Sequence, residues 1–113
     1  MNLNDYQQKA ISTLTSDYAF GDIDAQMMGI LLGLADESGE ILGKFKKILR
    51  DKAGVLSDDD KKEIAKELGD VLWYVATTAH LLGTDLASIA QMNADKLASR
   101  KERGVLGGSG DNR

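Results

Sequence analysis

Apolar residues recur at helical spacing in two long stretches of the chain, and no stretch alternates cleanly between apolar and polar positions. The first stretch, from about Ala25 to Leu49, carries the stripe Met27, Ile30, Leu31, Leu34, Ile41, Phe45 and Ile48. The second, which ends at about Leu82, carries the stripe Ile64, Leu68, Val71, Val75 and Leu82. A period of 3.6 residues predicts an amphipathic α-helix in each stretch. A short polar turn separates them, so we expect an antiparallel helix hairpin.

Turn and capping residues set the expected ends of this hairpin. Gly54 marks the turn between the two helices. Ser57 is placed to cap the second helix, with Asp60 in the reciprocal position of a capping box. Gly83 then ends that helix.

Two further helices are predicted outside the hairpin. A first helix begins near Asn4, an N-cap candidate with Gln7 three residues later, and runs to about Thr15. A loop follows from Ser16 to Asp24, with Gly21 as its breaker.

A fourth helix begins where Thr84 can cap it, runs from Asp85 to about Glu102 and stops at Gly104. The fold class is therefore all-α: a four-helix protomer with a long central antiparallel helix hairpin. We expect one domain over residues 1–104 and a Gly-rich C-terminal tail over residues 105–113. That tail is either a disordered end or a loop that folds over a bound phosphate, with Arg113 as a donor.

Composition favours assembly of this protomer with itself. The chain has 113 residues, of which 5% are aromatic, so its core must consist of Leu, Ile, Val, Ala and Met. Small helical protomers bury surface inefficiently, and a helical-bundle homo-oligomer would compensate for this.

Charge and residue content exclude several classes of function. A net charge of −4 argues against general nucleic-acid binding. The chain has no cysteine and one histidine, His80, which excludes disulfides and thiolate sites and disfavours zinc. Residues 1–10 lack an apolar signal core, and no apolar run is long enough to span a membrane. We therefore expect a cytoplasmic protein with no membrane partner.

Two acidic pairs, Glu37-x-x-Glu40 and Glu67-x-x-Asp70, are the main candidate for chemistry. Each spacing places both carboxylates on one helical face, beside the apolar stripe. Carboxylates about 5 Å apart repel by about 3 kcal/mol per pair at an effective dielectric near 20, so such a cluster needs a cation. A di-iron bundle would use Glu-x-x-His pairs, which are missing here, so oxygen ligands for magnesium or manganese fit better. The competing interpretation is two solvated helix faces.

Basic and amide residues offer a candidate phosphate clamp. Asn93, Lys96, Arg100 and Arg103 share one face of the fourth predicted helix. The alternative for them is simple dipole compensation near a helix C-terminus. Lys44 is set apart from its neighbouring lysines because it shares the flank of the first acidic pair.

Trp73 and Tyr74 are the aromatic residues next to an acidic pair, and either one can stack on a base. Tyr74 shares the carboxylate flank of its helix. Trp73 points to another side, where core or interface packing is the competing role.

This ordered set resembles the MazG-type all-α nucleoside triphosphate pyrophosphohydrolases. The resemblance rests on the two acidic pairs and on the segments that contain or follow them: 34–40 (LADESGE), 67–74 (ELGDVLWY), 82–86 (LGTDL) and the spacing Asn93-x-x-Lys96-Leu97-x-x-Arg100. It covers roughly residues 25–103. Asp36 departs from the pattern, since many members carry Glu there, and the Gly-rich tail is not a general feature of the family.

The resemblance implies a function and a site. Family members hydrolyse the α–β phosphoanhydride of (deoxy)nucleoside triphosphates to the monophosphate and pyrophosphate, with magnesium on the four acidic positions. They form homodimers or homotetramers whose sites draw on more than one chain. The positions that would contact substrate or phosphate are Lys44, Asn93, Lys96 and Arg100.

Mechanism and substrate stay open at this point. The general base is Glu40 or Glu67, and the cellular role by analogy is nucleotide-pool house-cleaning. A preference for dCTP or dUTP and a phosphoribosyl-ATP pyrophosphohydrolase are alternatives. A third is a non-enzymatic helical interaction module.

Overall fold

The computed structural model describes residues 1–15 and 19–113, and it contains four α-helices and no strand in those ranges. The helices are α1 (Leu3–Ser12), α2 (Ala25–Lys52), α3 (Asp58–Leu81) and α4 (Leu86–Glu102). The predicted all-α class is confirmed. None of the described helices combines the length and the apolar character that crossing a bilayer requires.

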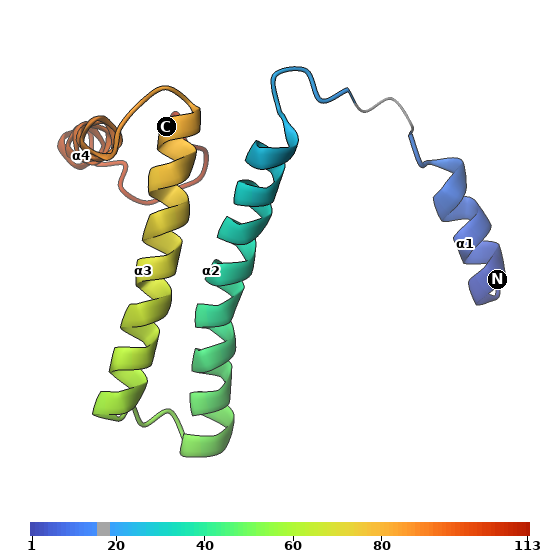
Figure 1. Cartoon of the computed structure of the whole chain (residues 1–113), viewed down its shortest axis with the longest axis horizontal. Helices are drawn as coiled ribbons and strands as arrows, with labels where there is room; N and C mark the ends of the chain where they lie inside the picture. Colours follow the sequence, from blue (N-terminus) through green and yellow to red (C-terminus); the bar gives the residue numbers. More distant parts are fainter. Residues whose placement is uncertain (16–18) are drawn as a thin grey trace.

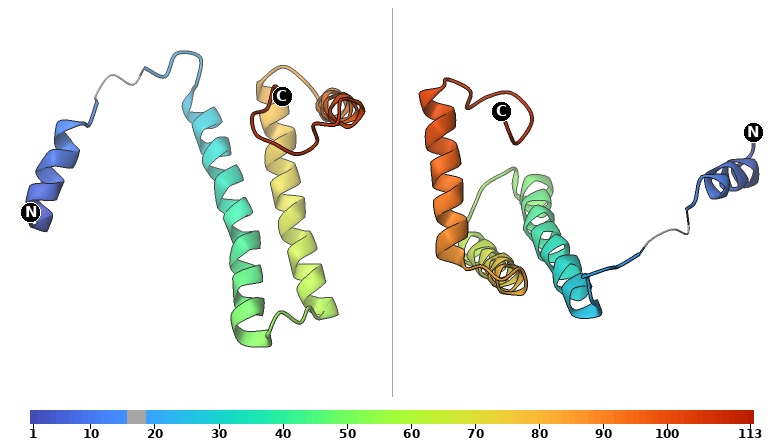
Figure 2. Two further views of the ribbon diagram at one scale, coloured as in Figure 1. Left: turned by 180° about the vertical axis from the view of Figure 1, so that it is seen from behind. Right: turned by 90° about the horizontal axis from the view of Figure 1, so that it is seen from above.

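Helices α2 and α3 lie side by side and antiparallel, and they make most of the contacts between elements (Figure 1). Helix α4 crosses the end of α3 and packs against it, as Figure 2 shows from above. Helix α1 stands apart and contacts none of the other described helices. The central hairpin and the returning fourth helix are therefore confirmed, whereas assembly into an oligomer stays a prediction.

The predicted start of the first helix is wrong by two residues. Asn2, not Asn4, caps α1: its Oδ1 accepts from the backbone N–H of Asp5 at 2.9 Å, and the Asp5 carboxylate accepts from the Asn2 N–H at 3.0 Å. The helix ends at Ser12 instead of Thr15. The capping box is therefore formed by Asn2 and Asp5. The sequence had suggested Asn4 and Gln7 for these two roles.

Part of the predicted loop Ser16 to Asp24 falls on residues 16–18, outside the described residues. Gly21 lies in a turn with φ of +52°, as its expected role as a breaker requires. Asp24 caps α2 by accepting from the Met27 N–H at 2.8 Å.

The fourth helix is capped by Asp85, not by Thr84. The Asp85 carboxylate accepts from the Ser88 N–H at 2.8 Å, and the helix starts at Leu86. Either side chain is chemically able to cap, and the stronger acceptor beside the first free N–H groups is the carboxylate.

A carboxylate fastens the turn of the hairpin. The capping box predicted for Ser57 and Asp60 is present, and Asp60 also accepts at 2.9 Å from Lys52, the last residue of α2. These contacts lower the pKa of Asp60 to about 2, chiefly through the hydrogen bond from Lys52. Asp60 therefore joins the end of one helix to the start of the next.

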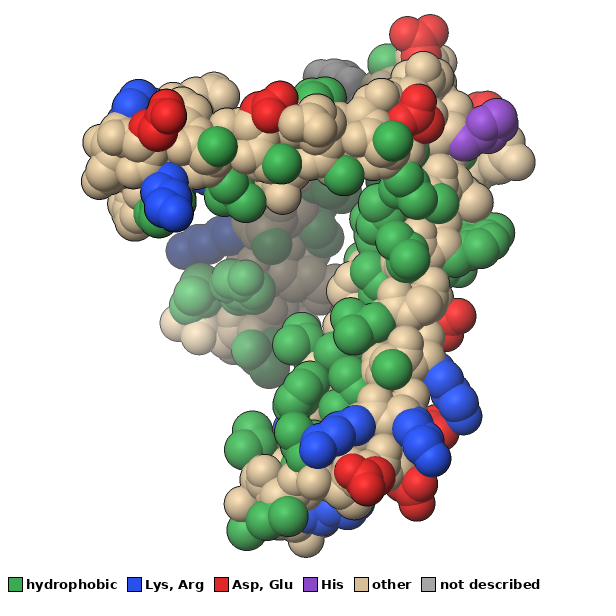
Figure 3. Space-filling model, turned by 90° about the vertical axis from the view of Figure 1, so that its left-hand side faces the viewer, with side chains coloured by type: hydrophobic (Ala, Val, Ile, Leu, Met, Phe, Trp, Pro, Cys, Tyr) green, Lys and Arg blue, Asp and Glu red, His purple; other side chains and the backbone are tan. Residues whose placement is uncertain are grey.

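The protomer buries little of its apolar surface. Ile48 and Ala79 are the buried hydrophobic residues of the described chain, whereas large side chains such as Leu42 and Leu72 are exposed. The chain exposes 9081 Å², while a folded monomer of 12.2 kDa exposes about 6,100 Å². In Figure 3, hydrophobic side chains line the inner side of the corner between α4 and the hairpin. A second copy is thus expected to cover part of this surface.

Gly33 allows the two long helices to approach closely. A Cβ built at this position would overlap the ring of Tyr74 on α3. Gly33 lies 21 residues before Gly54 and Tyr74 lies 20 residues after it, so an antiparallel hairpin brings the two to the same height. Close packing of α2 and α3 at this height therefore requires a residue without a Cβ at position 33.

Replacing Gly33 by Ala is expected to lower the free energy of unfolding by about 1–3 kcal/mol, because the added methyl group overpacks the seam. Gly39→Ala is the matched control on α2: its Cβ meets nothing within 4 Å, and the gain in helix propensity should stabilise by up to about 1 kcal/mol. Urea unfolding of both variants measures this difference. In a Tyr74→Ala background, Gly33→Ala should no longer destabilise, and a stabilising Gly33→Ala in the wild-type background would contradict the close contact.

Asp60→Asn is expected to lower the melting temperature at neutral pH. The folded pKa of Asp60 is depressed from 3.8, so its contribution is present above 3.8 and is lost as the pH falls through about 2. Thermal melts should therefore show a gap between wild type and variant at pH 7 that closes near pH 2. Asp59→Asn, an exposed neighbour on the same turn, should show a smaller gap. Equal gaps for the two variants would leave Asp60 without a special role.

Candidate metal centre

Three carboxylates from the two long helices converge on one small volume. Glu37 comes from α2, and Glu67 and Asp70 come from α3. One carboxylate oxygen from each lies within 4.8 Å of the others. The register of the hairpin explains this, because Glu37 lies 17 residues before Gly54 and Asp70 lies 16 residues after it. We refer to Glu37, Glu67 and Asp70 as the acidic cluster.

Lys44 partly neutralises the acidic cluster. Its Nζ lies 3.2 Å from Oε1 of Glu67, and both side chains are largely shielded from solvent, with exposed fractions of 30% and 18%. Three carboxylates and one ammonium leave two formal negative charges. This matches the charge of one divalent cation.

The pKa of Glu37 reflects the unfavourable surroundings of an anion in this cluster. Its pKa is raised above the ordinary value of 4.5, first by desolvation, then by the negative charge of Asp70, by a hydrogen bond with Glu67 and by the charges of Glu67 and Asp36. A raised pKa means that the folded protein holds this carboxylate less readily as an anion than the unfolded chain does. A bound cation would relieve that cost. The all-oxygen donor set fits magnesium or manganese.

Glu40, the fourth predicted ligand, lies outside the acidic cluster. It sits one turn further along α2, is exposed, and is not part of the group of carboxylates whose oxygens all lie within 4.8 Å of one another among the described residues. Its helix position turns it further from the seam than Glu37, at 100° per residue. Three of the four predicted ligands are thus brought together, and one is not.

The predicted phosphate clamp forms a separate region on α4. Asn93 and Lys96 border a pocket of about 380 Å³ whose other lining residues are Ile89, Met92 and Asp111. No member of the acidic cluster lines this pocket. Arg100 is buried, with 6% of its surface exposed, beneath residues 105–113. Within one protomer, the described structure does not bring these residues to the acidic cluster.

The two aromatic residues have different surroundings. The hydroxyl end of the Tyr74 ring lies against α2 at Gly33, so this part of the side chain is used by the hairpin itself. Trp73 meets Tyr74 edge to face, with ring centroids 4.9 Å apart, and stays 55% exposed. Of the two residues predicted to stack on a base, Trp73 has the accessible ring.

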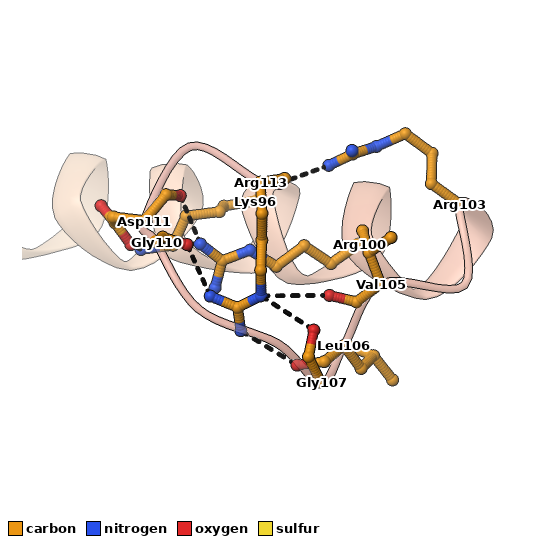
Figure 4. A network of polar contacts seen from close by, with 9 residues as sticks. All are labelled: Lys96, Arg100, Arg103, Val105, Leu106, Gly107, Gly110, Asp111 and Arg113. Carbon is orange, nitrogen blue, oxygen red and sulfur yellow. Dashed lines mark hydrogen bonds and ion pairs between the residues drawn. The ribbon is translucent and has the colours of Figure 1, made fainter.

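Residues 105–113 form a loop folded against α4 (Figure 4), so of the two alternatives for this segment the structure shows a folded loop and not a disordered end. The Arg113 guanidinium donates to the chain's own carbonyl oxygens, among them those of Leu106, Gly107 and Gly110. Asp111 pairs with both Lys96 and Arg100. The sequence carried no signal for Asp111, because a Gly-rich segment has no period from which to place a side chain.

The fold and the site define a class of protein: all-α proteins in which a helical hairpin carries a carboxylate cluster across its seam. Residues 26–105 match the MazG nucleotide pyrophosphohydrolase domain, and the chain belongs to this family. It is also similar to the "Gene 37 protein" of Mycobacterium phage L5, with 46% identity over 115 residues that cover the whole of both chains. No solved structure was found to match the chain. The predicted family is thus confirmed.

Neutralising Glu37 is expected to stabilise the metal-free protein. In Glu37→Gln the repulsion from Asp70 and Glu67 is removed, so the melting temperature at neutral pH should rise above that of wild type. Since the folded pKa of Glu37 is raised, its contribution to stability is full below 4.5 and is lost as the pH rises through the folded pKa. The advantage of the variant should therefore vanish below pH 4.5.

Glu40→Gln is the matched control, with the same chemical change one turn away on the same helix. It should leave the metal-free melting temperature close to that of wild type. Thermal melts in chelator measure both variants. A stabilising Glu40→Gln together with an inert Glu37→Gln would contradict the assignment of the strained carboxylate.

Proposed function

We propose that this protein is a magnesium-dependent hydrolase that converts (deoxy)nucleoside triphosphates to the monophosphate and pyrophosphate. The observation that carries the proposal is the acidic cluster of Glu37, Glu67 and Asp70 across the α2–α3 seam. Membership of the MazG nucleotide pyrophosphohydrolase domain family supports the type of reaction. Removal of unwanted nucleotides is the cellular role that fits this reaction.

The acidic cluster would hold the metal ion. Glu37, Glu67 and Asp70 supply oxygen donors from two helices. Glu40 is exposed one helical turn away and would join them through a change of its side-chain rotamer. Magnesium, and manganese as a substitute, would neutralise the phosphate charge and lower the pKa of a bound water.

The residues around the acidic cluster would balance its charge and accept the proton released in the reaction. Lys44 forms an ion pair with Glu67 and is also placed to meet a phosphate oxygen. Either Glu67 or Glu40 accepts the proton of the attacking water. The exposed ring of Trp73 offers a stacking surface for the base, three residues beyond Asp70 on α3.

A second protomer would complete the site. Asn93, Lys96 and Arg100 are suited to hold phosphate groups of the substrate and to stabilise the leaving pyrophosphate. They border or underlie a pocket that the acidic cluster does not line, and the protomer exposes about 3,000 Å² more than a folded monomer of its size. We propose a homodimer or homotetramer in which α4 of one chain faces the hairpin of another.

The direct test is product analysis with a panel of ribo- and deoxyribonucleoside triphosphates, with phosphoribosyl-ATP included, with and without magnesium. Wild type should release pyrophosphate, not orthophosphate, and only with magnesium. Asp70→Asn should lower kcat/KM by about 100-fold or more, because it removes a cluster ligand while the fold survives. Asp59→Asn, the same change at an exposed position of α3, should retain activity.

Two results would end this proposal. One is the absence of pyrophosphate from every substrate when folded wild-type protein is supplied with magnesium. The other is full activity in Asp70→Asn. The ranking of the substrates in a positive result identifies the base and the sugar.

A further inference from the structure

Asp111 gives Lys96 and Arg100 an anionic partner within the chain. Its Oδ1 lies 3.0 Å from Nζ of Lys96 and 3.1 Å from Nη2 of Arg100 (Figure 4). Arg100 also donates to the backbone carbonyl of Asp111. Both cations lower the pKa of Asp111, with Lys96 the larger cause, so the carboxylate is anionic at neutral pH.

The donors of Arg100 are used incompletely. Only 8% of its side chain is exposed, yet its Nε has no hydrogen-bond partner in the described structure. The hydrogen bonds to Asp111 all come from Nη2. A guanidinium can donate in a fork to two oxygens at once, and a phosphate group offers more acceptor oxygens than this single carboxylate. Asp111 is therefore a suboptimal occupant of a site suited to a larger anion.

The tail is shaped to deliver Asp111 to these cations. The Arg113 guanidinium donates at 2.6–3.0 Å to the carbonyl oxygens of Leu106, Gly107 and Gly110, which closes the loop on itself. Gly110, next to Asp111, has φ of +85°, a conformation that residues with a side chain rarely adopt. Arg103 donates to the Arg113 carbonyl at 3.0 Å and ties the loop to the end of α4.

The site also has space beside Asp111. The pocket of about 380 Å³ next to it is lined by Asn93 and Lys96 together with Asp111 itself. Asp111 is 78% exposed, so its exit needs no rearrangement of the helices. An incoming anion can approach through this pocket and take over both cations as the carboxylate leaves.

We infer that residues 105–113 act as an internal competitor of the substrate, in which Asp111 occupies the cations that would otherwise bind phosphate groups. This inference rests on the proposed function for the role of Lys96 and Arg100. The chain thus regulates its own site: the tail is closed when the site is empty and is displaced when a triphosphate or pyrophosphate binds. A carboxylate tethered eleven residues beyond Arg100 acts at an effective concentration on the order of millimolar, so a polyphosphate with more acceptor oxygens can displace it.

Binding of inorganic pyrophosphate, measured by calorimetry without metal, tests the competition independently of turnover. Asp111→Asn should bind pyrophosphate about three- to tenfold more tightly than wild type, the range expected when a largely exposed carboxylate loses its ion pairs to two cations. Arg113→Gln, which opens the loop but keeps Asp111, should tighten binding in the same direction. Asp95→Asn is the matched control on α4, since Asp95 accepts from Gln91 and not from the cations, and it should bind as wild type does.

Lys96→Gln added to Asp111→Asn should abolish the gain, which places the competition at these cations. Unchanged or weaker binding in Asp111→Asn would overturn the inference, and weaker binding would show that the tail positions the cations instead.

Turnover separates this inference from the proposed function. In Asp111→Asn the KM for the preferred triphosphate should fall about three- to tenfold while kcat stays within about twofold of wild type. Turnover with an unchanged KM overturns the competition and leaves the proposed function standing. Tighter pyrophosphate binding with no turnover in any variant overturns the proposed function and leaves the competition standing.

Discussion

Repulsion between like charges is the constraint around which the hairpin is built. Glu37, Glu67 and Asp70 stay together because packing along the α2–α3 seam and the contacts of Asp60 at the turn hold the helices at a fixed distance and register, and because Lys44 offsets part of the repulsion. Without those contacts, the carboxylates would separate and the raised pKa of Glu37 would return towards its ordinary value. The stability of the hairpin is therefore partly used to keep a charge pattern that folding alone disfavours. Such a pattern is typical of a site that waits for a cation.

The same seam explains which parts of the structure were predictable. The hydrophobic period predicted both long helices, and their register follows from the position of the turn at Gly54. Capping residues were less certain, because neighbouring polar side chains compete for one role: Asn2 and Asn4 at α1, and Thr84 and Asp85 at α4. The sequence shows which residue types can cap a helix, but which of two neighbours does so depends on one or two backbone dihedral angles.

For the acidic cluster, the sequence predicted which helix face carries each carboxylate but not which carboxylates come close to one another. Spacing placed Glu37 and Glu40 on one flank, yet only Glu37 lies close enough to α3 to join the acidic cluster. The contact of Asp111 with Lys96 was beyond reach for a different reason. It depends on backbone conformations in a glycine-rich loop, where neither periodicity nor capping restricts the path of the chain.

The contact between Gly33 and Tyr74 lies one helical turn from the acidic cluster, four residues before Glu37 on one helix and four residues after Asp70 on the other. It therefore sets the width of the gap that the carboxylates span. Magnesium accepts oxygen ligands at about 2.0–2.1 Å, and calcium accepts them at about 2.3–2.6 Å. A glycine that contributes no side chain to the seam thereby limits the spacing of the carboxylates, and in the proposed magnesium site a wider residue at that height would favour ions of larger radius.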